Sequence, residues 1–284
     1  MKKRGKRGQV QTALRYIVLI GVGVLMLYPL IWMVFATFKS NAEIFGSIAL
    51  WPEKWNFEAY KSIFKKYSGQ LNLPMAMANT YKMVLTKVAF TVASATLTAY
   101  GFARFNFIGH KTLFAVMIST LFLPQTVLNA PQYIMFAKWG MLDSYLPIVL
   151  PSLFAVDTYF VFMLVQFLRG IPKEMEEAAA IDGCNSFQTL LRVICPMLSP
   201  AMVSCALFQF MWSSNDFMGP LIYISTVAKK PASVFIKMCM DTDAGTAWNR
   251  ILAFSLLALA PSLVIFFFAQ KTFVEGISAG SLKG

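Results

Sequence analysis

The chain has 284 residues, of which 57% are hydrophobic and only 13% are charged, and its formal net charge is +12. Soluble domains contain about 25% charged residues, so this composition excludes an ordinary soluble enzyme, and the many aromatic residues exclude a disordered chain. An integral membrane protein remains, and such a chain has too little solvated surface for its positive charge to serve as a nucleic-acid binding face.

Six stretches of the sequence are long and apolar enough to cross a bilayer as helices. They comprise approximately residues 16–38, 76–102, 112–137, 145–168, 199–225 and 251–270. Their apolar residues do not alternate with a period of two, which argues against a β-barrel. We therefore expect an all-α integral membrane protein with one transmembrane domain, residues 16–271, between a basic tail of residues 1–15 and a C-terminal tail of residues 272–284.

The basic N-terminal tail sets the predicted orientation. Its six basic residues are accompanied by no acidic residue: Lys2, Lys3, Arg4, Lys6, Arg7 and Arg15. The positive-inside rule places this tail in the cytoplasm, and an even number of spans returns the C-terminus to the same side. The first apolar run is too long for a signal peptide and lacks a small-residue cleavage site, so we expect an uncleaved span.

The longest predicted outer loop, about residues 39–74, is rich in aromatic residues. These rings suit either ordinary anchors at the membrane interface or a docking surface for an external partner. Phe57, Tyr60 and Phe64 have helical spacing, which predicts a short interfacial helix over residues 56–64.

The segment of residues 169–198, between the fourth and fifth spans, is too polar to cross a membrane and too apolar to be a plain linker. Pro172 is followed by Glu174, Glu176 and Glu177, which predicts the start of a helix. Proline suits the first helical turn, and acidic side chains complement the helix dipole there.

Gly183 predicts the end of that helix, and Asn185 or Ser186 is expected to cap a second one over residues 187–194. The apolar side chains of the second helix are expected on one face: Phe187, Leu190, Leu191 and Ile194. The result is a cytoplasmic helical hairpin with one acidic and one apolar side, suited to insertion into a groove on another protein.

The hairpin is similar to the EAA loop of ATP-binding-cassette importer permeases, whose pattern is E-A-A-x3-G-x9-I-x-L-P. The matching residues are Glu177-Ala178-Ala179, Gly183 and Val193-Ile194-Cys195-Pro196, with Cys195 standing where leucine is usual. Other stretches resemble the carbohydrate-uptake, maltose-type permeases, namely YPLIWMVFATFKS, AYGFARFNF, FMWSSNDFMGPLIYI and FVEGISAGSLKG. The resemblance covers nearly the whole chain and is to the six-span second permease of those systems.

Two stretches depart from the family pattern. Where the family commonly has W-N-D-F, this chain has Trp212-Ser213-Ser214-Asn215-Asp216-Phe217, with two extra residues between Trp and Asn. Residues 67–77 look longer than the family's link to the second span. We expect both departures to affect the fit of substrate or partner.

The resemblance implies that the hairpin docks on an ATPase subunit. The implied coupling residues are Glu174, Glu176, Glu177, Ala178, Ala179, Asp182, Gly183, Phe187, Leu190 and Pro196. It also implies a bacterial cytoplasmic (inner) membrane location and a complex with a homologous second permease, two ATP-binding-cassette ATPase subunits and an extracytoplasmic sugar-binding protein. ATP and Mg²⁺ are expected at those ATPases and not on this chain, which lacks a G-x4-GK[ST] phosphate loop.

Neither catalysis nor metal binding is predicted for this chain. The single His110 lies far from the four cysteines in sequence, and no two cysteines form a CxxC pair. With no Ser–His or Cys–His constellation, no catalytic residue is expected. We therefore expect a non-catalytic subunit.

A path for a sugar needs amides or carboxylates beside aromatic platforms, because a sugar combines hydroxyl groups with apolar C–H faces. Ionisable residues in mid-membrane cost about 2.5–3.5 kcal/mol each, so they suggest a lined cavity. The candidate path residues lie in the third, fourth and fifth spans: Asn129, Gln132, Asp157, Tyr159, Trp212, Asn215 and Asp216.

Each of these residues also has a structural interpretation. Asp157 can pair with Lys82 or Lys87 of the second span, and Asn215 and Asp216 can cap or brace a helix end. The aromatic rings can simply pack within the bundle. The path assignment therefore depends on where the fold places these side chains.

The predicted function is that of a permease subunit of an importer for sugars, with oligosaccharides expected and alternating access driven by ATP. One alternative is the same architecture importing glycerol phosphate or a polyamine. A second is a proton-coupled secondary transporter with Asp157 as its proton site, and a third is a passive structural membrane protein. The last two leave the hairpin unexplained.

Overall fold

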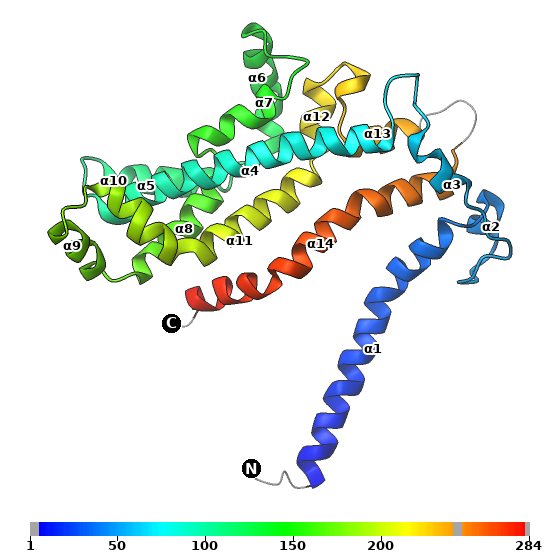
Figure 1. Cartoon of the computed structure of the whole chain (residues 1–284), viewed down its shortest axis with the longest axis horizontal. Coiled ribbons are helices and arrows are strands. Elements are labelled where there is room, and N and C mark those ends of the chain that lie inside the picture. The colour runs from blue at the N-terminus through cyan, green and yellow to red at the C-terminus, as the bar shows by residue number, and fades with distance from the viewer. Residues whose placement is uncertain (1–5, 241–245, 282–284) are drawn as a thin grey trace. The chain divides into compact units, whose positions relative to one another are not determined.

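The computed structural model describes residues 6–240 and 246–281, which form helices joined by turns (Figure 1). Within those ranges no β-sheet occurs, and an isolated antiparallel bridge joins Tyr67 to Leu71. The prediction of an all-α fold is confirmed. The basic residues Lys2, Lys3 and Arg4 and the end of the C-terminal tail lie outside the described residues.

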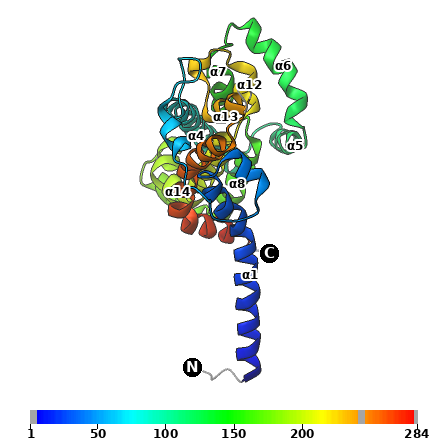
Figure 2. The ribbon, with the colours of Figure 1, turned by 90° about the vertical axis from the view of Figure 1, so that its right-hand side faces the viewer.

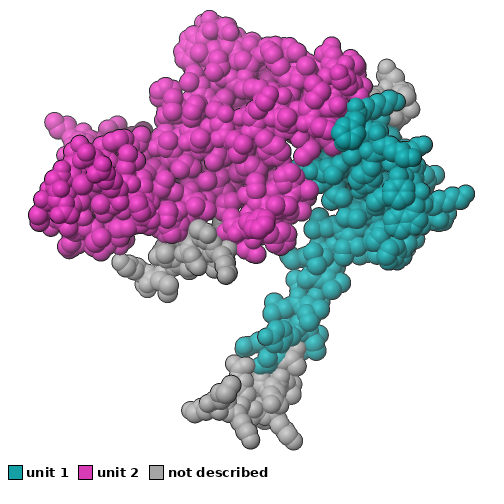
Figure 3. Space-filling view, viewed as in Figure 1, with its two compact units in different colours: residues 1–65, 236–258 teal, residues 66–235, 259–284 magenta. Residues whose placement is uncertain are grey.

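The chain divides into two compact units (Figure 3). The first consists of Met1–Lys65 and Ile236–Ala258, and the second of Lys66–Phe235 and Leu259–Gly284. Helices α13 (Ala232–Met240) and α14 (Trp248–Ser281) each contribute residues to both units. All the predicted path and hairpin residues belong to the second unit.

In the first unit, aromatic rings pack on the end of α1 (Lys6–Ala36). Phe38 stacks on Tyr60 with ring centroids 5.2 Å apart, and the Tyr60 hydroxyl lies 3.0 Å from Thr37 Oγ1. Phe35 lies 4.3 Å from Trp51. These rings of the loop therefore brace one another and the helix end.

Three short helical segments complete the described loop of the first unit: α2 (Asn41–Gly46), α3 (Glu58–Lys61) and η1 (Ser62–Phe64). The last two correspond to the short helix predicted over residues 56–64. Phe64, expected on the same face as Tyr60, is largely exposed.

The second unit is organised by three helices that share one core: α4 (Leu73–Arg104), α8 (Thr158–Gly170) and α11 (Cys195–Ser214). Helix α4 contacts both of the others and lies beside α11 in Figure 1. Ala99, Leu164 and Leu198 are among the core residues, all almost completely buried. Lipid tails are as apolar as these side chains, so close packing, rather than escape from water, holds such helices together.

Five helical segments are long and apolar enough to cross a membrane, or six if one sharply bent pair counts as a single span, within the described residues. The bent pair is the predicted third span, residues 112–137. It consists of α5 (His110–Thr120) and α6 (Gln125–Lys138), which meet at 101° (Figure 2). Pro124 explains the break, because proline has no N–H to continue the helical hydrogen bonds.

The predicted fourth span, residues 145–168, is also not one regular helix. It starts as α7 (Leu146–Val149) and the 3₁₀ segment η2 (Leu150–Phe154), and continues as α8. Ala155 separates the two parts with φ +53°, a left-handed conformation that interrupts a helix. This break places Asp157 at the start of α8 and not in the middle of a helix.

The predicted fifth span, residues 199–225, has both boundaries corrected. Helix α11 ends at Ser214, and α12 (Met218–Tyr223) follows as a separate short helix. In the other direction the helix continues back to Ser186 without a break. Pro196 lies inside this continuous helix, directly after the π turn of residues 190–194, so it does not start a new element.

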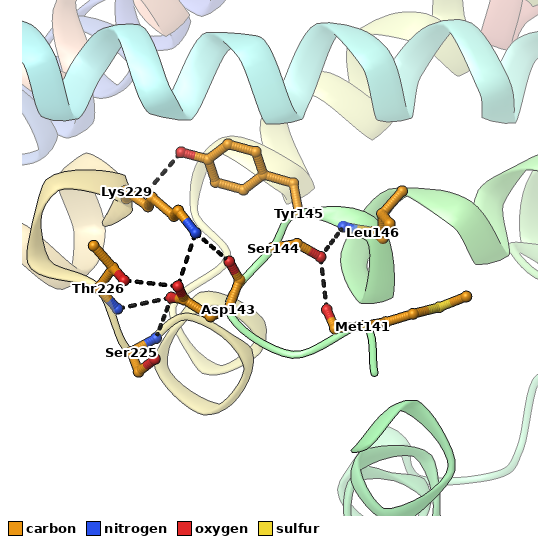
Figure 4. A network of polar contacts seen from close by, with 8 residues as sticks. All are labelled: Met141, Asp143, Ser144, Tyr145, Leu146, Ser225, Thr226 and Lys229. Atoms are coloured by element: carbon orange, nitrogen blue, oxygen red, sulfur yellow. Dashed lines mark hydrogen bonds and ion pairs between the residues drawn. The ribbon is translucent and has the colours of Figure 1, made fainter. Parts of the chain in front are cut away.

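Asp143, in the loop between α6 and α7, clamps the loop that follows α12 (Figure 4). Its Oδ1 accepts the backbone N–H groups of Ser225 and Thr226 at 3.1 and 2.8 Å. Its Oδ2 accepts Thr226 Oγ1 at 2.7 Å and Lys229 Nζ at 2.8 Å. These bonds, above all the one from Lys229 and then those from Thr226, hold the pKa of Asp143 well below its usual range.

Replacing Leu164 by Ala tests the shared core. We expect Leu164→Ala to lower the free energy of unfolding by about 2–5 kcal/mol, because it leaves a cavity among α4, α8 and α11. Leu85→Ala, at an exposed position of α4, is the matched control and should change stability by less than about 0.5 kcal/mol. Denaturant unfolding of the purified protein in detergent measures both, and equal effects would contradict the assigned core.

The Asp143 clamp predicts a specific pH dependence. A carboxyl with a lowered folded-state pKa stabilises the fold above its unfolded-state pKa of about 3.9, and this contribution is lost as the pH falls through the folded value. The melting temperature of the wild-type protein should therefore fall more steeply below about pH 4 than that of Asp143→Asn. Parallel melting curves for the two proteins from pH 6 to pH 3 would contradict the clamp.

Candidate functional site

A cavity of about 500 Å³ lies within the second unit and is lined by residues from α4, α6, α11, α12 and the segment from α7 to the start of α8. Five of the seven predicted path residues line it: Asn129, Gln132, Asp157, Trp212 and Asp216. Tyr159 and Asn215 do not line this cavity. The fold thus brings together polar residues from three separate predicted spans.

Asp157 is held by hydrogen bonds from two neighbouring helices. Thr91 of α4 and Gln209 of α11 both donate to its Oδ2, at 3.1 and 3.3 Å. Asp157 also stands at the N-terminal end of α8, where the helix dipole favours a negative charge. These three interactions give a half-buried carboxylate a fixed place at the cavity.

The alternative in which Asp157 pairs with a lysine of α4 is not found. In the described part of the chain, the ion pairs join Arg104 to Glu176 and Lys229 to Asp143. Lys87 lines the same cavity as Asp157 but makes no ion pair with it.

Asp216 and Asn215 brace helix ends, as their structural interpretation expects. Asp216 Oδ1 accepts the backbone N–H of Gly219 at 3.1 Å, and Asn215 Nδ2 donates to the Met211 carbonyl at 2.8 Å. A Cβ added at Gly219 would lie 2.7 Å from Asp216 Oδ2, so a larger residue there would displace the Asp216 carboxylate. Asp216 lines the cavity in addition to making this turn.

Trp212 is the aromatic residue of the predicted set that reaches the cavity. Its ring lies 5.4 Å from that of Tyr159 and 5.1 Å from that of Phe160, measured between centroids. Tyr159 therefore acts as a neighbour that supports Trp212. About half of the Trp212 surface stays exposed, which leaves ring area for contact with another molecule.

Several cavity residues were missed by the sequence interpretation, among them Lys87, Thr126, Ser152, Gln209, Ser213 and Tyr223. A usable signal existed on α11. Gln209, Trp212, Ser213 and Asp216 follow the spacing i, i+3, i+4, i+7 of one helical face. A polar stripe of this kind in an otherwise apolar span indicates a surface that does not face lipid.

The hairpin begins with α9 (Glu174–Ile181), which ends in a tight turn at Gly183. The N–H of Cys184 bonds to the Ala179 carbonyl, and the N–H of Gly183 bonds to the Ala180 carbonyl, both at 3.0 Å. This is the Schellman pattern, and the φ of +84° at Gly183 explains why glycine ends the helix.

Asn185 begins the second part of the hairpin with a capping box shared with Gln188. Helix α10 (Ser186–Thr189) then continues through η3 (Leu190–Ile194), one turn of π-helix, directly into α11. The second hairpin helix and the fifth span, predicted as separate elements, are therefore one continuous helix.

The single apolar face predicted for this helix is corrected to two faces. Leu190 and Ile194 are buried in the core of the second unit. Phe187 and Leu191 keep 59% and 52% of their surface exposed. Only the second pair is free to meet a partner.

The acidic residues of the hairpin also differ in their surroundings. Glu176 forms an ion pair with Arg104 at the end of α4, and it accepts a bond from Tyr100 Oη at 3.4 Å. Arg104 donates to the Ile171 carbonyl at 2.9 Å as well. Glu176 therefore ties the hairpin to α4 and points into this chain.

The predicted coupling residues fall into two groups by exposure. Those engaged or buried within this chain are Glu176, Ala179 and Leu190. Those exposed are Glu174, Glu177, Ala178, Asp182, Gly183, Phe187 and Pro196. The exposed group presents carboxylates and an aromatic ring on one small element.

No cluster of three or more His, Cys, Asp or Glu side chains suited to a metal ion occurs among the described residues. Cys184, Cys195, Cys205 and Cys239 are all free thiols.

Two named relatives resemble the chain over most of its length. A probable ABC transporter permease protein, YurM of Bacillus subtilis (strain 168), is 29% identical over 260 residues, which cover 90% of this chain and 84% of the relative. The trehalose/maltose transport system permease protein MalG of Thermococcus litoralis is 26% identical over 273 residues, covering 95% of this chain and 97% of the relative.

A solved structure shares the fold. A chain of a bacterial ABC transporter involved in the import of the acidic polysaccharide alginate superposes with a TM-score of 0.81 at 18% identity, covering 96% of this chain and 100% of that one. The family profile described as "Binding-protein-dependent transport system inner membrane component" matches residues 4–278. The chain therefore belongs to the family of binding-protein-dependent transport system inner membrane components.

Proposed function

We propose that this chain is a permease subunit of an ABC importer that moves oligosaccharides into a bacterial cell. The observation that carries the proposal is the cavity of the second unit, in which Asn129, Gln132 and Asp157 gather with Trp212. Carboxylate and amide groups bind hydroxyls, and an indole ring stacks on the apolar face of a sugar. The trehalose/maltose system named for the relative MalG supports the same substrate class.

The bent third span fits a transport path. Irregular backbone is tolerated at membrane depth where it lines a water-filled cavity and not where it faces lipid. Gln125, Asn129 and Gln132 of α6 all line the cavity. We count α5 and α6 as one broken span, which gives six spans in the inner membrane with both termini in the cytoplasm.

The hairpin is the docking element for an ATPase subunit in this proposal. Its exposed Phe187 and Leu191 supply an apolar contact, and the exposed Glu174 and Glu177 supply charge beside it. ATP and Mg²⁺ bind the two partner ATPases, and this chain holds no cofactor and catalyses no reaction. A homologous second permease and an extracytoplasmic sugar-binding protein complete the complex.

The continuous helix connects docking to the cavity. It runs from Ser186 in the hairpin to Ser214, beside Trp212 and Ser213 of the cavity wall. The Arg104–Glu176 ion pair joins the same hairpin to α4. Closure of the ATPases would thus move two core helices as rigid bodies and alternate access to the cavity.

Charge reversal at Glu177 tests the proposal. In proteoliposomes containing the assembled complex and its binding protein, Glu177→Lys should lower ATP-driven uptake of trehalose, maltose or maltotriose at least about tenfold, the equivalent of 1.4 kcal/mol of coupling. Glu53→Lys, an exposed residue of the first unit, is the matched control and should transport normally. Sugar uptake that needs a proton gradient and no ATP would favour the secondary transporter instead.

A pair of substitutions at Gly183 separates backbone strain from steric bulk. No atom lies within 4 Å of a Cβ built there, so the penalty comes from φ +84° alone. Gly183→Val should strain the turn by about 1–2 kcal/mol and uncouple ATP hydrolysis from uptake, whereas Gly183→Asn should be tolerated because asparagine adopts this conformation. The ratio of ATP hydrolysed to sugar accumulated measures both variants, and an unchanged ratio for valine would contradict the role of the turn.

A further inference from the structure

Ser213 carries a buried hydroxyl that is left without a hydrogen-bond partner among the described residues. The residue is only 3% exposed, yet it lines the cavity. An unsatisfied buried polar group is costly and rare in a native fold, so it calls for a physical explanation. A hydroxyl beside a cavity is explained when a ligand in that cavity completes its bonding.

Ser213 also belongs to the unusual part of the sequence. Ser213 and Ser214 lie between Trp212 and Asn215, in the stretch that departs from the W-N-D-F pattern of the family that the sequence resembles. Ser214 Oγ is likewise buried and without a partner in the described chain, but Ser214 does not line the cavity. This pair of serines therefore places one hydroxyl at the cavity wall and a second, otherwise similar hydroxyl away from it.

The neighbours of Ser213 supply complementary chemistry. Trp212 adds a half-exposed ring, and Gln209, one turn earlier on the same helical face, donates to Asp157. Thr91 donates to the same Oδ2 atom of Asp157, and no described residue bonds to Oδ1. One carboxylate oxygen is thus fixed by the protein while the other remains able to accept a bond from a ligand hydroxyl.

The charge of the cavity selects among sugars. Its described lining contains the carboxylates of Asp157 and Asp216 and the ammonium of Lys87, an excess of one negative charge. Like charges repel strongly where the effective dielectric constant is low. A sugar carrying a carboxylate would be disfavoured here, and a neutral sugar would not.

We propose that Asp157, Trp212 and Ser213 form a subsite for one uncharged sugar residue of the transported oligosaccharide. Trp212 stacks on the ring, while Ser213 Oγ and Asp157 Oδ1 hydrogen-bond its hydroxyl groups. Thr91 and Gln209 act as positioning residues that hold the Asp157 carboxylate. This inference rests on the proposed import function and adds to it the chemical class of substrate that this chain accepts.

The first test compares Ser213→Ala with Ser214→Ala in the assembled complex. Uptake into proteoliposomes is measured for maltotriose, cellotriose and raffinose, and the neutral sugar that the wild type takes up fastest is used. Ser213→Ala should raise KM about threefold to tenfold with little change in maximal rate, because it loses one hydrogen bond to the bound sugar. Ser214→Ala should leave both constants unchanged.

A purely structural role of Ser213 makes a different prediction. Removing an unsatisfied hydroxyl should leave the melting temperature equal or slightly higher in both variants. A raised KM at an unchanged melting temperature would therefore indicate that the Ser213 hydroxyl contacts the bound sugar. Equal uptake kinetics for Ser213→Ala and Ser214→Ala would overturn the subsite while leaving the importer proposal intact. Failure of the wild type to take up any sugar of the panel would instead overturn the importer proposal.

The second test addresses charge. Quenching of tryptophan fluorescence in the detergent-solubilised complex, without its binding protein, reports binding of maltotriose and of the anionic trigalacturonate. We expect the wild type to prefer maltotriose at least about tenfold and Asp157→Asn to reduce that preference severalfold, because the variant removes a negative charge without changing shape. Equal affinity of the wild type for both sugars would overturn the selection of uncharged substrates.

Discussion

The hydrogen bonds of Asp157 join the three helices that make up the core of the second unit. Asp157 begins α8, Thr91 lies on α4 and Gln209 lies on α11, and both side chains donate to one carboxylate oxygen. A buried polar group needs such hydrogen-bond donors to offset the cost of leaving water. The position of the cavity wall therefore depends on this shared contact, since a shift of any one helix would leave a charge without its partners.

Breaks in the helices are what allow a cavity to form there. Pro124 lies in the break of the third span, directly before its second half, and Ala155 interrupts the fourth just before Asp157. A regular helix satisfies its own backbone hydrogen bonds and presents side chains on every face. An interrupted helix can direct its polar groups into one shared cavity. The polar residues of α6 and the start of α8 reach the same cavity because both segments are interrupted.

The sequence was sufficient for the helical class, for most of the long apolar helices and for the helix end at Gly183, because each depends on local composition. Hydropathy identifies long apolar segments. Gly183 and Asn185 are strong local signals for a helix end and a helix start. The breaks were missed because hydropathy does not register a change of backbone conformation such as that at Ala155. The pairing of Glu176 with Arg104 was missed because it joins residues distant in the chain. Ser213 was noted only within a departure from the family pattern, because its buried hydroxyl without a partner is seen only in the folded chain.

The π turn of η3 has a geometric consequence for the continuous helix. A π turn contains one more residue than an α turn, and each residue of an α-helix advances the side chains by about 100° around the axis. The extra residue therefore sets the angle between the face that carries Phe187 and Leu191 and the face that carries Gln209 and Ser213. Deleting or inserting a single residue at this turn would rotate one face against the other, although the composition of both would be unchanged.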